Sequence, residues 1–179
     1  MEETSSERIK IGQTERISKH ITQTDLTLYA AVTGDFNPVH FDPVYAARSP
    51  FKEPIVHGMI TAGLISALLG MKLPGPGTVY LRQTLGFLAP VKPGDVITAC
   101  VEVVELLQKN RIRLTTTCTN QEGIKVLEGE ALVVAPRQLG HGTSRFWDKA
   151  FADPYLFSGT NFAITVYFSK VRSSIYKTS

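Results

Sequence analysis

The sequence predicts an α+β fold in which an antiparallel sheet wraps around one long buried helix. An apolar stretch from Ile55 to Met71 has the spacing of a helix, and its apolar residues cover so much of its surface that burial on most sides is expected. From Thr78 to Val134 the hydrophobic period changes to two, which is typical of strands. The chain has 179 residues, 43% of them hydrophobic, which is enough for one domain with a substantial core.

The first two elements are expected to be a short strand and a helix. Ile9, Ile11 and residues 16–18 indicate the strand. Residues 22–25 offer a helix start with an acidic residue near its N-terminus, and apolar residues then recur at helical spacing up to Gly34.

Prolines break the segment between this helix and the long one. A proline disfavours helical structure at the residue before it, so residues 38–54 are expected to form turns with at most one helical turn, over 44–47. We expect Asp42 to cap that helical turn. Long irregular segments inside compact domains are commonly functional. The prolines are Pro38, Pro43, Pro50 and Pro54.

Four segments after the long helix are predicted to be strands. Turn residues at 92–95 and 120–123 separate some of them, and the four strands are expected to form an antiparallel meander. The predicted strands span residues 78–88, 96–107, 111–120 and 125–134. The side of the helix that packs against them is expected to carry Ile60, Leu64, Ala67, Leu68 and Met71.

The composition of the chain changes near residue 136. Residues 1–136 are predicted to form the α+β domain, and residues 137–179 an aromatic, basic C-terminal extension without an assigned role. The extension holds 9 of the 16 aromatic residues, and six Lys or Arg against two Asp or Glu. Its aromatic content disfavours disorder, so we expect a packed appendage with one added strand over 162–171.

Several classes of protein are excluded by composition. Cys100 and Cys118 lie in predicted strands and form neither a zinc spacing nor a disulfide framework, which suits a reducing compartment. The acidic N-terminus lacks the apolar region of a signal peptide, and no stretch is long enough for a membrane span. We expect no nucleic-acid partner, and a cytoplasmic location, or the mitochondrial matrix for a eukaryotic mature form.

The most informative stretch runs from Tyr29 to His40 and reads YAAVTGDFNPVH. It brings Asp35, Asn37 and His40 into one short turn, because a glycine and a proline within it prevent a continuous helix. Aspartate and histidine are residue types that often transfer protons near neutral pH, and an amide can orient a neighbour or a water. Taken alone, however, an aspartate in such a turn is usually a local capping residue.

The order of residues around this turn is more specific than the Asp–His pair. An aromatic residue and a small residue precede Gly-Asp-x-Asn-Pro-x-His, and Ala46 follows after five intervening residues. This order resembles the signature of the MaoC-like (R)-specific enoyl-CoA hydratases, also called hydratase 2, and the resemblance covers roughly residues 8–136. It implies the hot-dog architecture, normally as a homodimer in which two sheets join.

The resemblance also implies roles for residues of the turn and of the long helix. Asp35 and His40 would activate water and shuttle its proton, with Asn37 as part of the same polar turn. The backbone N–H of Gly58 would stabilise charge on the thioester oxygen, since a helix N-terminus has unpaired amides and the positive end of the dipole. The substrate would be an acyl thioester of CoA or acyl carrier protein, with no metal and no other cofactor.

Two further residues and one loop also bear on the same site. His57 is interpreted as positioning the start of the helix rather than as a proton-transfer group. Ser66 matches a small hydroxyl residue on the family's central helix, and it either bonds within the active-site wall or back-bonds to the preceding turn. Residues 74–81 resemble the loop and strand that flank the acyl-thioester tunnel in this group.

The predicted function is reversible syn hydration of trans-2-enoyl-CoA, or enoyl-ACP, to the (3R)-hydroxyacyl thioester. The enzyme would be a hydro-lyase of fatty-acid or polyhydroxyalkanoate metabolism. One alternative is a hot-dog acyl-CoA thioesterase, although that class does not use the turn with Asp35 and His40. The other alternative is a non-catalytic acyl-thioester-binding module, which would be expected to have lost one of these two residues.

Overall fold

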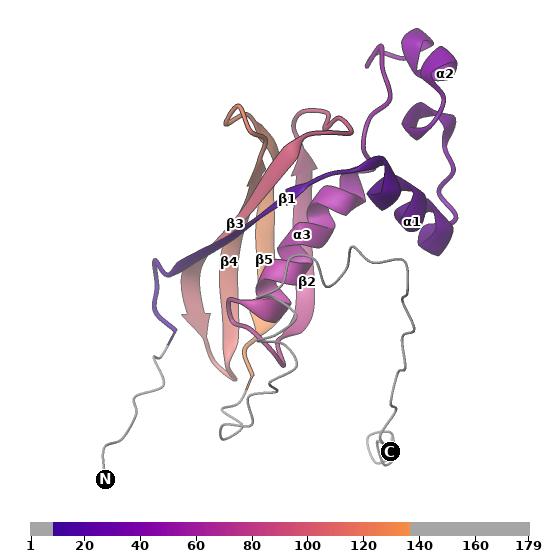
Figure 1. Ribbon diagram of the computed structural model, residues 1–179. Coiled ribbons are helices and arrows are strands. Elements are labelled where there is room, and N and C mark those ends of the chain that lie inside the picture. The colour runs from indigo at the N-terminus through magenta and orange to yellow at the C-terminus, as the bar shows by residue number, and fades with distance from the viewer. Residues whose placement is uncertain (1–8, 137–179) are drawn as a thin grey trace, which may run out of the picture. The chain divides into compact units, whose positions relative to one another are not determined.

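The computed structural model describes residues 9–136 of the chain (Figure 1). A five-stranded antiparallel sheet packs one face against the helix α3 (Gly58–Met71), which confirms the predicted α+β class. The predicted extension over 137–179, with its strand at 162–171, lies outside the described residues. The strands are β1 (Thr14–His20), β2 (Val79–Phe87), β3 (Val96–Leu107), β4 (Arg111–Thr119) and β5 (Lys125–Val134).

Hydrophobic alternation located the strands closely. β3 and β5 have the predicted bounds, and the ends of β2 and β4 differ from the prediction by no more than one residue. Ile9 and Ile11, which were assigned to the first strand, precede β1 instead, because Gly12 turns the chain with a φ of 82°. Alternate residues of β3 form the inner face of the sheet and are fully buried, namely Ile97, Ala99, Val101 and Val103.

The order of the strands corrects the predicted four-strand meander. β3, β4 and β5 pair consecutively, but β2 pairs with β5, and β1 occupies the free edge of β3. The connection from β2 to β3 passes beside Ile21, whose carbonyl accepts a hydrogen bond from the N–H of Gly94. Periodicity shows where a strand lies, but the pairing partner depends on such long-range contacts.

The central helix begins at Gly58 rather than at Ile55. The N–H of Ile55 donates to the carbonyl of Val39, and the N–H of Val56 donates to that of Val91, so both residues are bound in an extended segment before the helix. The buried side of α3 also differs from the prediction, since Ala67 is exposed. The buried residues of α3 are Thr61, Ala62, Leu64, Ile65, Leu68 and Leu69.

The helix α1 (Gln23–Thr33) has the start and end that the sequence indicated. The Thr22 side chain accepts a hydrogen bond from the N–H of Asp25, and the Asp25 carboxylate accepts one from the N–H of Thr22. Burial opposes ionisation of Asp25, but these bonds and the nearby Lys19 ammonium together hold its pKa below the ordinary value. Gly34 ends α1 in a left-handed conformation, with a φ of 80°.

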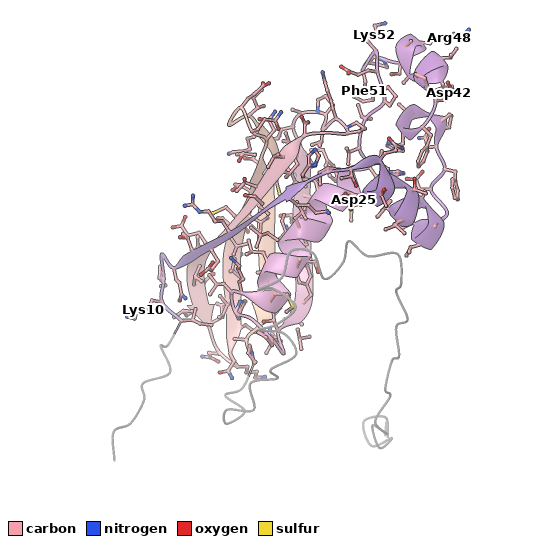
Figure 2. All side chains as sticks on the ribbon, viewed as in Figure 1. Lys10, Asp25, Asp42, Arg48, Phe51 and Lys52 are labelled. Atoms are coloured by element: carbon pink, nitrogen blue, oxygen red, sulfur yellow. The ribbon has the colours of Figure 1, made fainter. Side chains whose placement is uncertain are left out.

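We call residues 22–57 the overhang, because in Figure 1 this segment projects beyond the N-terminal end of α3. It contains α1, the 3₁₀ turn η1 (Pro38–His40) and the short helix α2 (Pro43–Arg48). Asp42 caps α2 as predicted, since its carboxylate accepts from the N–H groups of Val44 and Tyr45. Figure 2 places Asp42, Arg48, Phe51 and Lys52 at the outer part of the overhang. None of the helices formed by residues 9–136 has the length and apolar character needed to cross a membrane.

Candidate active site

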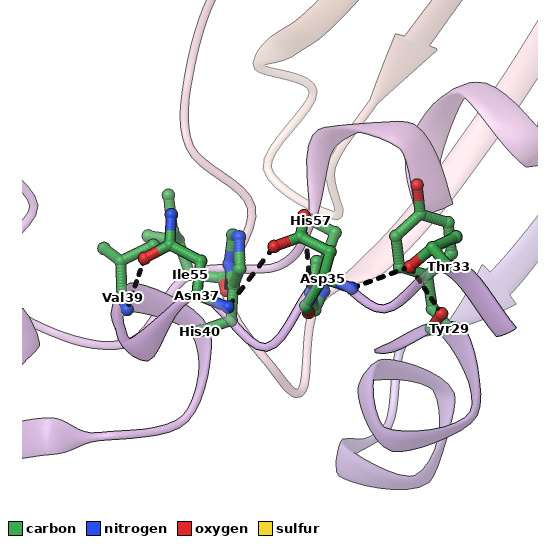
Figure 3. Close-up of polar contacts among 8 residues, drawn as sticks. All are labelled: Tyr29, Thr33, Asp35, Asn37, Val39, His40, Ile55 and His57. Carbon is green, nitrogen blue, oxygen red and sulfur yellow. Dashed lines mark hydrogen bonds and ion pairs between the residues drawn. The ribbon is translucent and has the colours of Figure 1, made fainter. Parts of the chain in front are cut away.

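The turn after α1 presents Asp35 with its carboxylate accessible. The Thr33 hydroxyl donates to the carbonyl of Tyr29 and accepts from the N–H of Asp35, which fixes the backbone of the turn (Figure 3). The Asp35 carboxylate accepts from the N–H of Asn37 at 3.3 Å, and its side chain is 48% exposed. Asp35 therefore has oxygen lone pairs left for a ligand or a water.

Asn37 shapes the next turn. Its side-chain oxygen accepts a hydrogen bond from the N–H of Val39 at 3.2 Å, so Asn37 caps η1, and Pro38 occupies the first position of that turn. The cap places His40 one turn beyond Asp35 with its ring directed inward. Asn37 thus acts on the site through the backbone in this structure.

The ring of His40 is anchored through one of its nitrogens. His40 is 8% exposed, and Nδ1 lies 2.8 Å from the carbonyl oxygen of Ile55. A carbonyl can only accept, so Nδ1 carries the proton that is donated to Ile55. In the neutral ring Nε2 then has a free lone pair and can act as a base.

His57 lies against both His40 and Asp35. Its ring stacks on that of His40, with 3.7 Å between ring centroids and 27° between planes. Its Nε2 lies 3.0 Å from the Asp35 carbonyl oxygen and 4.0 Å from the carboxylate. Tyr29 and Phe41 pack on the ring as well, and His57 is only 2% exposed. The structure therefore adds His57, which is distant in the sequence, to the Asp35 and His40 of the turn and forms one cluster.

Asp35, His40 and His57 each offer an atom within 4.8 Å of the others, a spacing that could accommodate a metal ion. The two imidazole rings are nearly parallel, however, so their in-plane lone pairs do not converge on one point between them. One nitrogen of each ring is also already bonded to a backbone carbonyl, Nδ1 of His40 to Ile55 and Nε2 of His57 to Asp35. The arrangement fits proton transfer better than metal coordination.

An apolar cavity of about 430 Å³ opens beside His40. Its only polar side chains are those of His40 and Thr61, and Asp35 is not part of its wall. Such a lining suits an acyl chain. The wall is formed by His40, Phe51, Ile55, Val56, Gly58, Met59, Thr61, Phe87, Leu88, Ala89, Pro90, Val91 and Val126.

Gly58 lies in the cavity wall as the first residue of α3. As in any helix, the first N–H groups have no partner within the helix, so the Gly58 amide is available to a ligand. A side chain cannot be added here without displacement, because a Cβ on Gly58 would lie 2.7 Å from Cε1 of Phe87. Glycine thus lets the Phe87 ring pack directly over the start of the helix.

Ser66 and the 74–81 segment are not beside this cavity. Ser66 is exposed on α3, and neither it nor residues 74–81 belong to the cavity wall. Thr61 occupies the wall instead, and its buried hydroxyl has no hydrogen-bond partner among the described residues. Thr61 was not predicted from the sequence. It lies three residues after Gly58 on the same helix, and this spacing places the two residues on one face, which could have indicated that Thr61 lies near the site.

Comparisons with known proteins identify the family. The sequence profile described as MaoC like domain matches residues 5–124. The chain is 49% identical over 133 residues to a 3-hydroxybutyryl-CoA dehydratase of Methylorubrum extorquens, covering 74% of this chain and 84% of that protein. It is 45% identical to an (R)-specific enoyl-CoA hydratase of Aeromonas caviae, covering 74% of this chain and 99% of that protein. The chain belongs to the MaoC-like family.

The fold agrees with that assignment. An unliganded R-hydratase from Pseudomonas aeruginosa is similar with a TM-score of 0.69 and 50% identity, over 73% of this chain and 84% of that one. The chain therefore has the hot-dog fold that the motif implied, with α3 as the central helix.

Proposed function

We propose that this protein catalyses the reversible syn hydration of a trans-2-enoyl-CoA to the (3R)-hydroxyacyl-CoA. One observation carries the proposal, namely that Asp35 and His40 offer an oxygen and a ring nitrogen within 4.8 Å, next to an apolar cavity that begins at Gly58. Hydratase and dehydratase relatives at 45% and 49% identity support it. The enzyme is a hydro-lyase, with a place in fatty-acid or polyhydroxyalkanoate metabolism.

The spacing of Asp35 and His40 suits a shared water. One water can hydrogen-bond to two groups whose atoms lie within 4.8 Å of each other. As the water oxygen bonds to C3, this pair removes a proton from it, and the electrons of the double bond move toward the thioester carbonyl. The pair then delivers a proton to C2, which restores the carbonyl. Addition from one side gives syn stereochemistry, and such proton transfer accelerates a reaction by about 10²–10⁴-fold.

The charge that develops on the thioester oxygen requires a donor. Gly58 lines the cavity and its N–H belongs to the first turn of α3, where amides have no partner within the helix and the positive end of the dipole favours negative charge, which supports it as this donor. Loss of one such donor typically costs about 3 kcal/mol of transition-state stabilisation. The reaction moves protons without net electron transfer, so we propose no cofactor other than the CoA that carries the acyl group.

We further propose that the enzyme works as a homodimer. β2 forms one edge of the sheet and exposes Val79, Tyr80 and Leu81. An edge strand with large exposed apolar side chains is a surface for pairing with a second chain. A second copy would also cover the exposed side of α3, where Ser66 lies, and Ser66 keeps its proposed substrate-binding role only in such a dimer.

The first test is the wild-type protein with crotonyl-CoA. Loss of the ultraviolet absorbance of the enoyl thioester, with a product that an (R)-specific but not an (S)-specific dehydrogenase oxidises, is the expected result. Release of free thiol would instead establish a thioesterase. Tight binding without any change in absorbance, over acyl chains of several lengths, would indicate a binding module.

A further inference from the structure

We propose that His57 is a positioning residue that holds the Asp35 turn against the start of α3, so that Asp35 and His40 face one water. The inference rests on the hydratase activity proposed above and assigns to His57 a specific hydrogen bond within that reaction. His57 itself does not exchange protons with the substrate in this account, and it is not part of the cavity wall.

The hydrogen bond from His57 is the connection between the turn and the helix. Nε2–H of His57 donates to the Asp35 carbonyl at 3.0 Å across 22 residues of sequence. Among the described residues, the other hydrogen bonds of residues 34–37 go to α1 or to neighbours within η1 and the turn. Within this part of the chain, the His57 bond is the one hydrogen bond that links the Asp35 carbonyl to the segment that carries Gly58.

The second nitrogen of His57 defines its tautomer. Nδ1 is buried and has no hydrogen-bond partner among residues 9–136, although His57 is the N-cap residue of α3 and could have capped it. A proton on buried Nδ1 would be an unsatisfied donor, whereas the proton on Nε2 is bonded to Asp35. His40 has the opposite arrangement, with its proton on Nδ1 toward Ile55. The two stacked rings therefore place their protons on different atoms.

The position of Asp35 depends on His57 more strongly than the position of His40 does. The ring of His40 has its own anchor on the Ile55 carbonyl at 2.8 Å, so its position survives a change in the stacked ring. The Asp35 side chain is half exposed, and among residues 9–136 it accepts a single hydrogen bond, from the N–H of Asn37 at 3.3 Å. We therefore expect the N–H of His57, rather than its aromatic ring, to be the essential feature.

Two substitutions separate the N–H from the ring. His57→Phe keeps an aromatic ring against His40 but cannot donate to Asp35, and His57→Gln keeps a donor near the position of Nε2 but loses the ring. The phenylalanine variant is expected to lower kcat by about 10²-fold, the usual consequence of a small misplacement of a reacting group, with KM changed by less than about threefold. The glutamine variant is expected to recover at least about tenfold of that loss. His20→Gln, at an exposed position at the end of β1, is the matched control and should retain wild-type kcat.

Kinetics and spectroscopy overturn the inference in different ways. Wild-type kcat in the phenylalanine variant, or an equal loss in both variants, would show that the N–H does not position the pair. The imidazole ¹⁵N spectrum of the wild type is the second measurement and does not depend on folding of any variant. It should show His57 protonated on Nε2, and protonation on Nδ1 would overturn the inference. Inactive wild-type protein with the expected spectrum would leave the hydrogen bond correct and the proposed reaction wrong.

Discussion

The sheet with α3 and the overhang are stabilised in different ways. The inner face of the sheet is almost entirely apolar, and side chains such as Ile97 and Leu114 are fully buried. In the overhang, large apolar side chains are exposed, and Val32 is 86% exposed. Its backbone is held by caps at Thr22, Asn37 and Asp42. The sheet therefore derives its stability from buried area, whereas the overhang buries only a few apolar residues such as Leu26, relies more on single polar bonds, and leaves polar side chains accessible for chemistry.

Leu26 and Val56 of the overhang pack into the core beneath the sheet, and hydrogen bonds at the candidate site tie the polar turns of the overhang to residues 55–57, which lead into α3. His40 donates to the carbonyl of Ile55, and His57 donates to the carbonyl of Asp35. The extended residues before α3 also bond to both regions, since Ile55 binds Val39 and Val56 binds Val91. The difference predicts that changes of the polar side chains in the turns at 35–40 will affect catalysis with little effect on unfolding, and that changes in the sheet will do the opposite.

The largest effect is expected for the Asp35 and His40 side chains. Asp35→Asn and His40→Gln should each lower kcat for crotonyl-CoA by about 10²–10⁴-fold, since each removes proton transfer. Asp35 is half exposed, so Asp35→Asn should change the free energy of unfolding by less than about 0.5 kcal/mol. The control is Asp42→Asn, which makes the same chemical change but keeps a good helix cap. Comparable activity in Asp35→Asn and Asp42→Asn would contradict the assignment.

A substitution in the sheet should show the reverse pattern. Leu114→Ala on β4 opens a cavity beneath α3 and should destabilise the protein by about 2–5 kcal/mol. At temperatures where the variant is folded, kcat should stay near the wild-type value, because Leu114 is not in the cavity wall. Urea unfolding and the absorbance assay test this, with Leu106→Ala at an exposed position of β3 as the control. A large loss of kcat in folded Leu114→Ala protein would show that the two regions are coupled.

Gly58 lies at the boundary and should affect both properties. Gly58→Ala forces the new Cβ against the Phe87 ring and displaces the proposed oxyanion donor. kcat should therefore fall by about tenfold or more, and the upper limit is the loss of about 3 kcal/mol of transition-state stabilisation that removal of one donor typically causes. Gly63→Ala is the matched control on the same helix, where a Cβ meets nothing within 4 Å. It should raise stability by about 0.5–1 kcal/mol and leave kcat unchanged. Equal effects of the two substitutions on kcat would remove the argument for Gly58.

A smaller effect is expected for the cap at the start of the overhang. Asp25→Ala should cost about 1 kcal/mol at neutral pH, because it removes half of a capping box. The pKa of Asp25 in the folded protein is below the ordinary 3.8, so the stabilisation is present above that value and is lost as the pH falls through the folded pKa. Urea titrations at neutral and acid pH should show the difference from wild type shrinking in acid. Glu122→Ala, at an exposed turn position, should show no such trend.

The smallest expected effect concerns the two cysteines of the sheet. Burial, with a contribution from Cys100, raises the pKa of the Cys118 thiol to about 12, so Cys118 stays a neutral thiol in ordinary buffers. Cys100 is only partly buried. A thiol reagent under native conditions should therefore modify Cys100 first, and mass spectrometry of peptides identifies the site. Faster modification of Cys118 would mean that the inner face of the sheet opens readily.

The local elements were predictable from sequence because local signals determine them. The period of two gave the bounds of β3 and β5, and Asp25 and Gly34 marked the ends of α1. The bend residues around Asp35 indicated that polar side chains gather there. These features depend on neighbours a few residues away, which a single sequence records.

The features that were missed depend on contacts between distant segments. The pairing of β2 with β5 and the late start of α3 at Gly58 follow from bonds that span many residues. The stack of His57 on His40 and the place of Thr61 in the cavity wall are of the same kind. Ser66 matches the motif but lies outside the cavity of the described residues, so its substrate-binding role stays a prediction.

The central claim is that Asp35 and His40 act as one unit on a single water, and a double variant tests it most directly. kcat with crotonyl-CoA would be measured for Asp35→Asn, for His40→Gln and for the protein carrying both changes. Groups that act as a unit have strongly non-additive effects, so the double variant should be about as slow as the slower single variant. If the two losses multiply instead, the residues act independently, and the shared-water account is contradicted.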